Sequence, residues 1–194
     1  MDSLKIIGAH GKRRENDFYP TPWDATAALC EWLDEAGENG VTVWEPACGN
    51  GSMVKVLEEY GYNVYGTDIQ TGTDFLAQTS LPEAIADADD LWIITNPPFS
   101  LAEEFIRKAH YFGKPFAMLL KCQYWHSAKR LKLFRDTHPA YILPLTWRPD
   151  FTGGGNSLMD MMWVVWNGCE RKTEYEPLGK PKARRQTAEK YGEE

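Results

Sequence analysis

The segment Asn96-Pro97-Pro98-Phe99 is the part of the sequence whose residue types most directly indicate chemistry. It follows the apolar run 91–94 after a single threonine, so a predicted strand ends on it. Neither proline has a backbone N–H and each fixes its own φ, so the segment can neither continue the strand nor relax into a helix. It therefore presents an amide, fixed carbonyl groups and an aromatic ring at one sheet edge. These groups suit the binding of an amino group, although the same residues would also serve as a rigid turn.

A glycine-containing turn about fifty residues upstream, Glu45 to Gly51, offers a second group of candidate residues. It follows the β-branched run 41–43 and leads into an apolar segment, which together predict the first βα unit of a Rossmann-like sheet. Its two glycines lack the side chains that would keep a ligand away from the backbone. Its glutamate can accept a hydrogen bond from an ammonium group or a hydroxyl. Position 54 is Val, so the pattern G-x-G-x-x-G is incomplete and NAD binding is disfavoured.

Together, the two segments resemble motifs of the amino-group DNA methyltransferases that use S-adenosylmethionine, chiefly the N6-adenine type. The matching residues are Glu45-Pro46-Ala47-Cys48-Gly49-Asn50-Gly51 and Asn96-Pro97-Pro98-Phe99, within an ordered set of motifs over about positions 17 to 167. The resemblance implies an α/β fold of the Rossmann-like methyltransferase kind, with a mostly parallel sheet and an antiparallel hairpin at its edge. Small enzymes of this appearance are familiar from bacteriophages and prophages.

The resemblance also implies which residues bind S-adenosylmethionine. The segment 17–22 resembles the family's N-terminal cofactor motif, which lies near the methionine end of the cofactor. Asp68 ends the second predicted strand and is implied to bind the ribose hydroxyls, while Asp74 is implied to receive the adenine amino group between apolar neighbours. The full implied cofactor set is Tyr19, Thr21, Pro22, Glu45, Pro46, Ala47, Cys48, Gly49, Asn50, Gly51, Asp68, Ile69, Asp74, Phe75 and Asn96.

The resemblance implies that the catalytic residues are Asn96, Pro97, Pro98 and Phe99. An exocyclic amino group on a purine is a poor nucleophile because its lone pair is delocalised. The Asn96 side-chain carbonyl and the Pro97 backbone carbonyl can accept its two N–H bonds and aim the lone pair at the cofactor's methyl group. Transfer is then a direct in-line displacement in which positioning supplies much of the acceleration, with no metal or covalent intermediate. The Phe99 ring offers a face on which a flipped-out base can stack.

The coarse pattern of the chain predicts one α/β domain. The last two predicted strands lack a helical crossover, so we expect an antiparallel hairpin there, and Ser100 is a natural N-cap. Only about twenty residues separate Asp68 from Leu91, so we expect a loop or a single helical turn where the family usually has more. We expect helices at about 25–36, 52–60, 101–112 and 126–137, and strands at about 41–46, 63–68, 91–95, 115–121, 140–145 and 160–166.

Length and composition agree with one compact domain. We expect an N-terminal arm at 1–16, a methyltransferase domain at 17–169 and a flexible C-terminal tail at 170–194. No run of about twenty apolar residues is present, so we expect a cytoplasmic protein, in the host cytoplasm if phage-encoded. The four cysteines are scattered, which favours reduced thiols over zinc. None lies in the strand-end turn, so the cysteine nucleophile of C5-cytosine methylation is missing.

The net charge of −7 requires a DNA-binding protein to concentrate its cations locally. Short basic runs occur at 12–14 and 180–185, and further cations gather between them. Short basic runs are usually solvated surfaces, but together with the methyltransferase motifs a phosphate contact is a reasonable expectation for at least one of these groups. The cations between the runs are Lys121, Lys129, Arg130, Lys132 and Arg135.

Three functions fit these motifs. The leading hypothesis is a DNA adenine-N6 methyltransferase; the alternatives are a methyltransferase for RNA guanine N2 or protein glutamine, and a non-catalytic nucleic-acid-binding module of the same fold. Only about 28 residues follow Trp166, so we expect sequence selectivity to be short, loop-based or supplied by another chain. The glycine-rich loop 148–156 either lines the target-base pocket, with Phe151 as a wall, or is a plain hairpin loop. The oligomeric state stays open, a monomer included.

Overall fold

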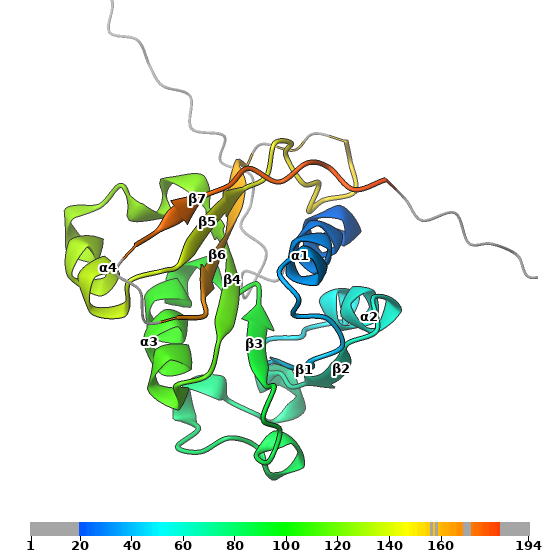
Figure 1. Cartoon of the computed structure of the whole chain (residues 1–194), viewed down its shortest axis with the longest axis vertical. Helices are drawn as coiled ribbons and strands as arrows, with labels where there is room; N and C mark the ends of the chain where they lie inside the picture. The colour runs from blue at the N-terminus through cyan, green and yellow to red at the C-terminus, as the bar shows by residue number, and fades with distance from the viewer. Residues whose placement is uncertain (1–19, 156, 158, 169–171, 183–194) are drawn as a thin grey trace, which may run out of the picture.

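A computed structural model describes residues 20–155, 157, 159–168 and 172–182. Tyr19 and the arm 1–16 lie outside these residues. Seven strands of the described chain form one sheet in the order β2-β1-β3-β4-β6-β5-β7 (Figure 1). No helix in this part of the chain is long and apolar enough to cross a membrane.

The sheet is mostly parallel and contains an antiparallel hairpin toward one edge, as the sequence predicts. Strands β2 (Asn63–Gly66), β1 (Thr42–Glu45), β3 (Trp92–Thr95) and β4 (Phe116–Lys121) run parallel to one another. Strand β6 (Met161–Trp166) is antiparallel to both β4 and β5 (Tyr141–Pro144). The parallel half therefore brings four strand carboxyl ends to one edge.

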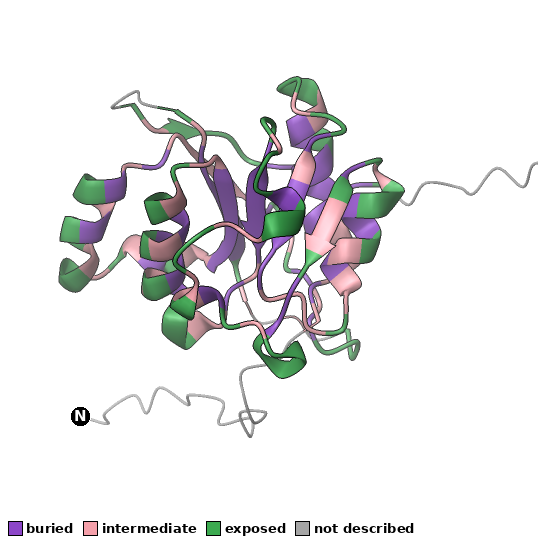
Figure 2. Cartoon of the chain, turned by 90° about the horizontal axis from the view of Figure 1, so that it is seen from below, coloured by how far each residue is buried: buried purple, intermediate pink, exposed green. Residues whose placement is uncertain are grey.

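In the described residues, four α-helices cover the two faces of the sheet: α1 (Trp23–Glu35) and α2 (Ser52–Glu59) on one, and α3 (Ala102–Phe112) and α4 (Leu131–Thr137) on the other (Figure 1). Alternate residues of β4 enter the two hydrophobic clusters: Leu119 joins the α1 side and Leu120 the α3 side. Figure 2 shows the buried strands between helices whose outer faces are exposed. Cover on both faces explains why the central strands are continuous apolar runs in the sequence.

The start of α3 differs from the prediction, because Ser100 is not its N-cap. Ser100 lies inside a 3₁₀ turn, η5 (Phe99–Leu101), and α3 begins at Ala102 after Leu101. The backbone N–H of Leu101 donates to the Pro98 carbonyl at 2.9 Å. Since the prolines hold the chain extended up to position 98, a tighter turn must form before an α-helix can start. Likewise α4 is shorter than predicted, because two 3₁₀ turns, η6 (Cys122–Trp125) and η7 (Ala128–Arg130), precede it.

The short crossover between Asp68 and β3 contains no α-helix, as expected. Three 3₁₀ turns replace it: η2 (Ile69–Thr71), η3 (Phe75–Ala77) and η4 (Glu83–Ile85). Phe75 anchors this segment, since its ring lies 5.2 Å from the Trp44 ring and 5.0 Å from the Phe105 ring. Aromatic packing therefore fixes a crossover that has little secondary structure.

Residues 172–182 do not form the flexible tail that the sequence predicts. Strand β7 (Glu174–Tyr175) pairs in parallel with β5, and Leu178 forms a further bridge to Leu145. The Trp32 indole donates to Glu176 Oε2 at 2.9 Å, which ties this segment to α1. The segment covers the edge of β5, whose backbone groups would otherwise be unpaired.

Candidate active site

A cavity of about 1090 Å³ opens at the carboxyl ends of β1, β2, β3 and β4. The strand order reverses between the neighbouring strands β1 and β3. From β1 the chain continues to β2 on one side of the sheet, and from β3 it continues to β4 on the other side. Such a reversal leaves a crevice at the strand ends, where open α/β sheets bind ligands. The two sequence motifs end these strands and thus face each other across the crevice.

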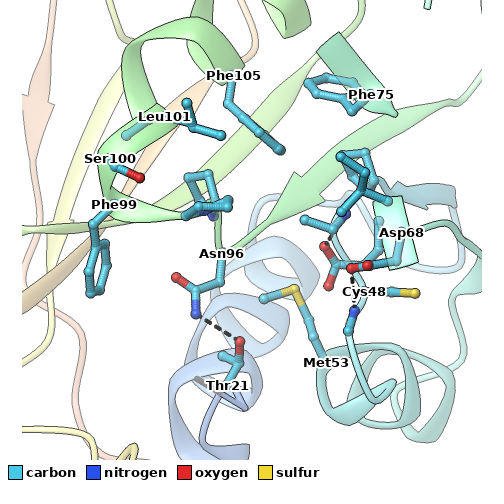
Figure 3. Close-up of a pocket in the computed structure, with 18 of the residues that line it drawn as sticks. Thr21, Cys48, Met53, Asp68, Phe75, Asn96, Phe99, Ser100, Leu101 and Phe105 are labelled. Atoms are coloured by element: carbon cyan, nitrogen blue, oxygen red, sulfur yellow. Dashed lines mark hydrogen bonds between the residues drawn. The ribbon is translucent and has the colours of Figure 1, made fainter. Parts of the chain in front are cut away.

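Most predicted site residues line this cavity, as the close-up in Figure 3 shows for several of them. Two predicted cofactor residues are not on its wall: Pro22 precedes α1, and Gly51, with a φ of 78°, precedes α2. Tyr19 lies outside the described residues. The predicted residues on the wall are Thr21, Glu45, Pro46, Ala47, Cys48, Gly49, Asn50, Asp68, Ile69, Asp74, Phe75, Asn96, Pro97, Pro98 and Phe99.

Glu45 is the most deeply buried carboxyl group of the cavity, with 2% of the residue exposed. Its Oε1 accepts from the Thr95 hydroxyl at 2.6 Å and from the Ala47 backbone N–H at 3.3 Å. Burial raises the pKa of Glu45 from 4.5 to about 7, against the lowering effect of these two hydrogen bonds. A cationic ligand would reverse this and favour the ionised carboxylate.

Asp68 fixes the backbone around the cavity through both carboxylate oxygens. Oδ2 accepts from the Gly49 N–H at 2.9 Å, and Oδ1 accepts from the Gln70 N–H at 2.8 Å. The first bond joins the end of β2 to the glycine turn after β1, and the second caps η2. Each carboxylate oxygen can accept more than one bond, so Asp68 still has acceptor positions for a ligand hydroxyl.

The crossover supplies an apolar and acidic wall. Ile69 is 68% exposed, which is unusual for a large aliphatic side chain and provides a surface for a flat ligand. Asp74 is exposed and accepts from the Leu76 N–H at 2.9 Å. Phe75 is almost fully buried, so it supports the wall from behind more than it presents a face.

Asn96 lies between the two sides of the cavity (Figure 3). Its Nδ2 donates to the Thr21 hydroxyl at 3.1 Å, which fixes the orientation of the amide. Its Oδ1 is buried and has no hydrogen-bond partner among the described residues. A buried carbonyl oxygen without a donor is costly, so this atom marks a place where a ligand N–H would be stabilising.

The side of the cavity beyond Asn96 carries aromatic rings and cations. The Lys121 Nζ lies 4.1 Å from the centroid of the Phe99 ring, and the Arg130 Cζ lies 4.1 Å from that of Tyr124. Burial raises the pKa of Tyr124 to about 12, although the nearby Arg130 charge opposes the effect. Its phenol therefore stays neutral at physiological pH.

Cys48 and Phe151 differ in their relation to the cavity. Burial, together with the charges of Glu45 and Asp68, raises the pKa of the Cys48 thiol, so it is a protonated wall residue and a poor nucleophile. Phe151 does not form a wall of the cavity, because it is 6% exposed and packs in the hydrophobic cluster that contains α1 residues. Its loop is a hairpin connection, and the base-pocket alternative for it is wrong.

Solved structures share this architecture, whereas no protein-family model and no curated protein sequence matches the chain. A type I restriction-modification methyltransferase subunit from Streptococcus thermophilus matches with a TM-score of 0.60 and 13% identity, over 82% of this chain and 47% of that one. A modification subunit of a proposed type I restriction enzyme from Vibrio vulnificus gives 0.53 and 14%, over 91% and 49%. The fold is that of the Rossmann-like methyltransferases.

A proposed RNA methyltransferase from Pyrococcus horikoshii also has this methyltransferase fold, with a TM-score of 0.51 and 15% identity over 83% of this chain and 91% of that one. The chain spans about half the length of the two restriction-system subunits and nearly all of the Pyrococcus protein. Identities this low show the fold alone.

Within this methyltransferase fold, sequence reasoning missed part of the cavity wall. The clearest case is Tyr124, which follows β4. Strand β4 is parallel to β3, so its carboxyl end opens on the same edge, and that neighbour relation was the available signal. Other wall residues gave no such signal; they include Met53, Leu101 and Phe105 at single helical positions, and Met159 in the segment before β6.

Proposed function

We propose that this protein transfers a methyl group from S-adenosylmethionine to the exocyclic N6 amino group of adenine in DNA. The observation that carries the proposal is the buried Asn96 Oδ1, which has no donor among the described residues and belongs to a residue that lines a large cavity. An adenine amino group has two N–H donors and fits this acceptor together with the backbone carbonyl of Pro97.

The opposite side of the cavity supports S-adenosylmethionine as the cofactor. This molecule carries a sulfonium and an ammonium charge, and the cofactor side presents Glu45, Asp68 and Asp74. The exposed Ile69 provides an apolar surface for the adenine ring. Drug-sized ligands occupy cavities of about 300–1,000 Å³, so a cavity of about 1090 Å³ has room for a cofactor with a target base beside it.

The chemistry follows from the position of Asn96 between the two sides. Two accepted N–H bonds hold the target amino group and direct its lone pair at the sulfonium methyl group. The N–C bond forms as the S–C bond breaks; the sulfonium becomes a neutral thioether and the amine then releases one proton to water. The protein orients both reactants, and positioning of this kind contributes much of the rate. Phe99 supplies a ring face for the extruded base.

The test is methyl transfer from tritiated S-adenosylmethionine to DNA, to RNA of the same sequence and to protein, followed by nucleoside analysis. We expect label in N6-methyladenine of DNA. Asn96→Ala should lower kcat by about 100- to 1,000-fold, the range seen when one preorganised polar group is removed from an active site. Asn96→Asp is the matched control, since a carboxylate oxygen can also accept the N–H bond assigned to the Asn96 side chain and should retain much of the rate.

Calorimetry separates chemistry from binding in this test. Asn96→Ala should bind S-adenosylmethionine within about threefold of the wild type, because the Asn96 oxygen is assigned to the target base. Label in RNA or protein, with none in DNA, would replace the substrate assignment; the similarity to the Pyrococcus protein makes RNA the first comparison. Absence of cofactor binding by the wild type would contradict methyl transfer altogether.

A further inference from the structure

Lys121 and Arg130 occupy one end of the cavity, and the fold places both there. Lys121 is the last residue of β4, whose parallel neighbour β3 leads into Asn96. Arg130 ends the short turn η7, and its Nη1 donates to the Tyr124 carbonyl at 2.7 Å. One guanidinium donor is thus used to fix the side chain, while the others remain for a ligand.

Neither cation has a carboxylate within ion-pair distance among the described residues. Elsewhere in the described chain some cations pair with a carboxylate, as Lys132 does with Asp136 at 2.6 Å and Arg107 with Glu103 at 2.8 Å. Others, such as Lys108 and Lys114, donate to backbone carbonyls. Carboxylates outnumber cations by 28 to 21 over the sequence, so uncompensated cations inside a cavity are notable. They lie instead on aromatic rings, each about 4.1 Å from a ring centroid.

The cavity is therefore polarised between its two ends. Glu45, Asp68 and Asp74 line the cofactor side, where a cationic cofactor is stabilised. Lys121 and Arg130 line the other end, where an anion is stabilised. Proteins that bind single-stranded nucleic acid combine ring faces for the bases with cations for the backbone, and this end of the cavity has both.

We infer that Lys121 and Arg130 bind the phosphates that flank the target nucleotide. The inference rests on the proposed function, because it assigns Phe99 and Asn96 to the target base itself. It adds the residues that would bind the substrate backbone, and it favours a phosphodiester chain over a peptide. It also explains how a chain with a net charge of −7 can bind DNA without a broad basic face.

The experiment measures binding of the full chain to a fluorescent single-stranded DNA oligonucleotide without cofactor, over a series of salt concentrations. Each phosphate contact to a single strand contributes a slope of about −0.7 in a plot of log K against log salt. Lys121→Gln and Arg130→Gln should each reduce the slope by about 0.7 and the double variant by about 1.4. Lys132→Gln is the control, because this lysine is exposed and already paired with Asp136.

Arg130→Lys keeps the positive charge but changes the group that bonds the Tyr124 carbonyl. It should retain the wild-type slope, so it distinguishes the effect of the charge from the effect of losing that hydrogen bond. RNA of the same sequence should show equal losses, since the contact is to phosphate. In turnover assays the double variant should raise KM for DNA about tenfold or more while KM for S-adenosylmethionine stays unchanged.

A wild-type slope in the double variant, or an equal loss in Lys132→Gln, would overturn the inference. Absence of oligonucleotide binding by the wild type would also overturn it. Binding that depends on both cations, without any methyl transfer, would support this inference while contradicting the proposed function, so the two can fail separately.

Discussion

The two ends of the cavity differ in the sign of their charged residues and in how those residues are bonded within the fold. At the cofactor end, the carboxylates of Asp68 and Glu45 already accept hydrogen bonds from backbone and side-chain groups, and both residues are buried. At the other end, Lys121 and Arg130 are half-buried, rest on aromatic rings and lack a carboxylate partner among the described residues. The carboxylates of the first end are stabilised by hydrogen bonds within the fold, whereas the cations of the second have no carboxylate partner among the described residues.

This difference teaches where binding and folding are coupled. A change at the cofactor end removes an acceptor from partly buried backbone hydrogen bonds, so it should alter both stability and cofactor affinity. A change at the cationic end removes no internal ion pair among the described residues, so it should alter substrate binding more than stability. Measuring the unfolding free energy and the ligand affinities of the same variants therefore compares the two ends.

Asp68→Ala should have the largest effect on the cofactor end. It leaves the Gly49 and Gln70 N–H groups without their acceptors, which costs about 2 kcal/mol or more of unfolding free energy. We also expect cofactor affinity to fall about 100-fold, or about 2.7 kcal/mol, because the turn and the proposed ribose contact are lost together. Urea denaturation and calorimetry measure the two quantities, and affinity for DNA should be unchanged.

Asp74→Ala is the matched control for this prediction, since it removes a carboxylate from the same wall. Asp74 is exposed and accepts one backbone N–H, so its loss should cost little stability and less than tenfold in cofactor affinity. Equal losses of stability in the two variants would show that the cofactor end is not coupled to folding through Asp68.

Glu45→Gln should change how stability depends on pH. The folded protein holds the Glu45 proton up to a pKa of about 7, whereas the unfolded chain loses it near 4.5. Between these values the folded state binds more protons, so the unfolding free energy of the wild type falls as pH rises. The glutamine variant does not titrate there, so its stability relative to the wild type should rise by about 3 kcal/mol from pH 4 to pH 8.

Urea denaturation of both proteins at several pH values measures this difference, and parallel pH curves would contradict it. Saturating S-adenosylmethionine should reduce the difference, since a cation beside Glu45 favours the ionised carboxylate and offsets part of the cost of burial. This reduction would show that the buried Glu45 carboxyl interacts with the positive charge of the bound cofactor.

The sequence was sufficient for the residues that end parallel strands. Glu45 and Asn96 could be placed on one edge because each follows a short apolar run, and strand carboxyl ends share an edge in a parallel sheet. The glycine turn and the two prolines have conformational requirements that are visible in the residues themselves. Local signals therefore predicted the two motifs and the sheet that brings them together.

The sequence was insufficient wherever a contact depends on distant residues. The polar segment 172–182 looks like a tail, yet β5 offers it an unpaired edge and Leu178 is almost fully buried. Phe151 lies in a glycine-rich loop, yet its side chain reaches the core. The positions of Lys121 and Arg130 over aromatic rings likewise follow from packing between β4 and η5 and between η6 and η7, which no local pattern encodes.

Phe99→Leu should give the smallest of these effects and confine it to the cationic end. The ring is the proposed stacking face for the target base, and base–aromatic stacking is worth about 1–3 kcal/mol per base. We therefore expect KM for DNA to rise about tenfold, with an unchanged affinity for S-adenosylmethionine. Stability should change by less than about 1 kcal/mol, because Phe99 is only partly buried.

Phe99→Tyr keeps the ring and should restore KM, which separates stacking from side-chain size. In Phe99→Leu the Lys121 charge loses its ring partner but keeps its place at the end of β4, so the salt dependence of oligonucleotide binding should persist. A loss of cofactor affinity in Phe99→Leu as large as in Asp68→Ala would mean that the two ends do not act separately. A selective effect on DNA would show that stacking and phosphate binding are separate contributions of the same end.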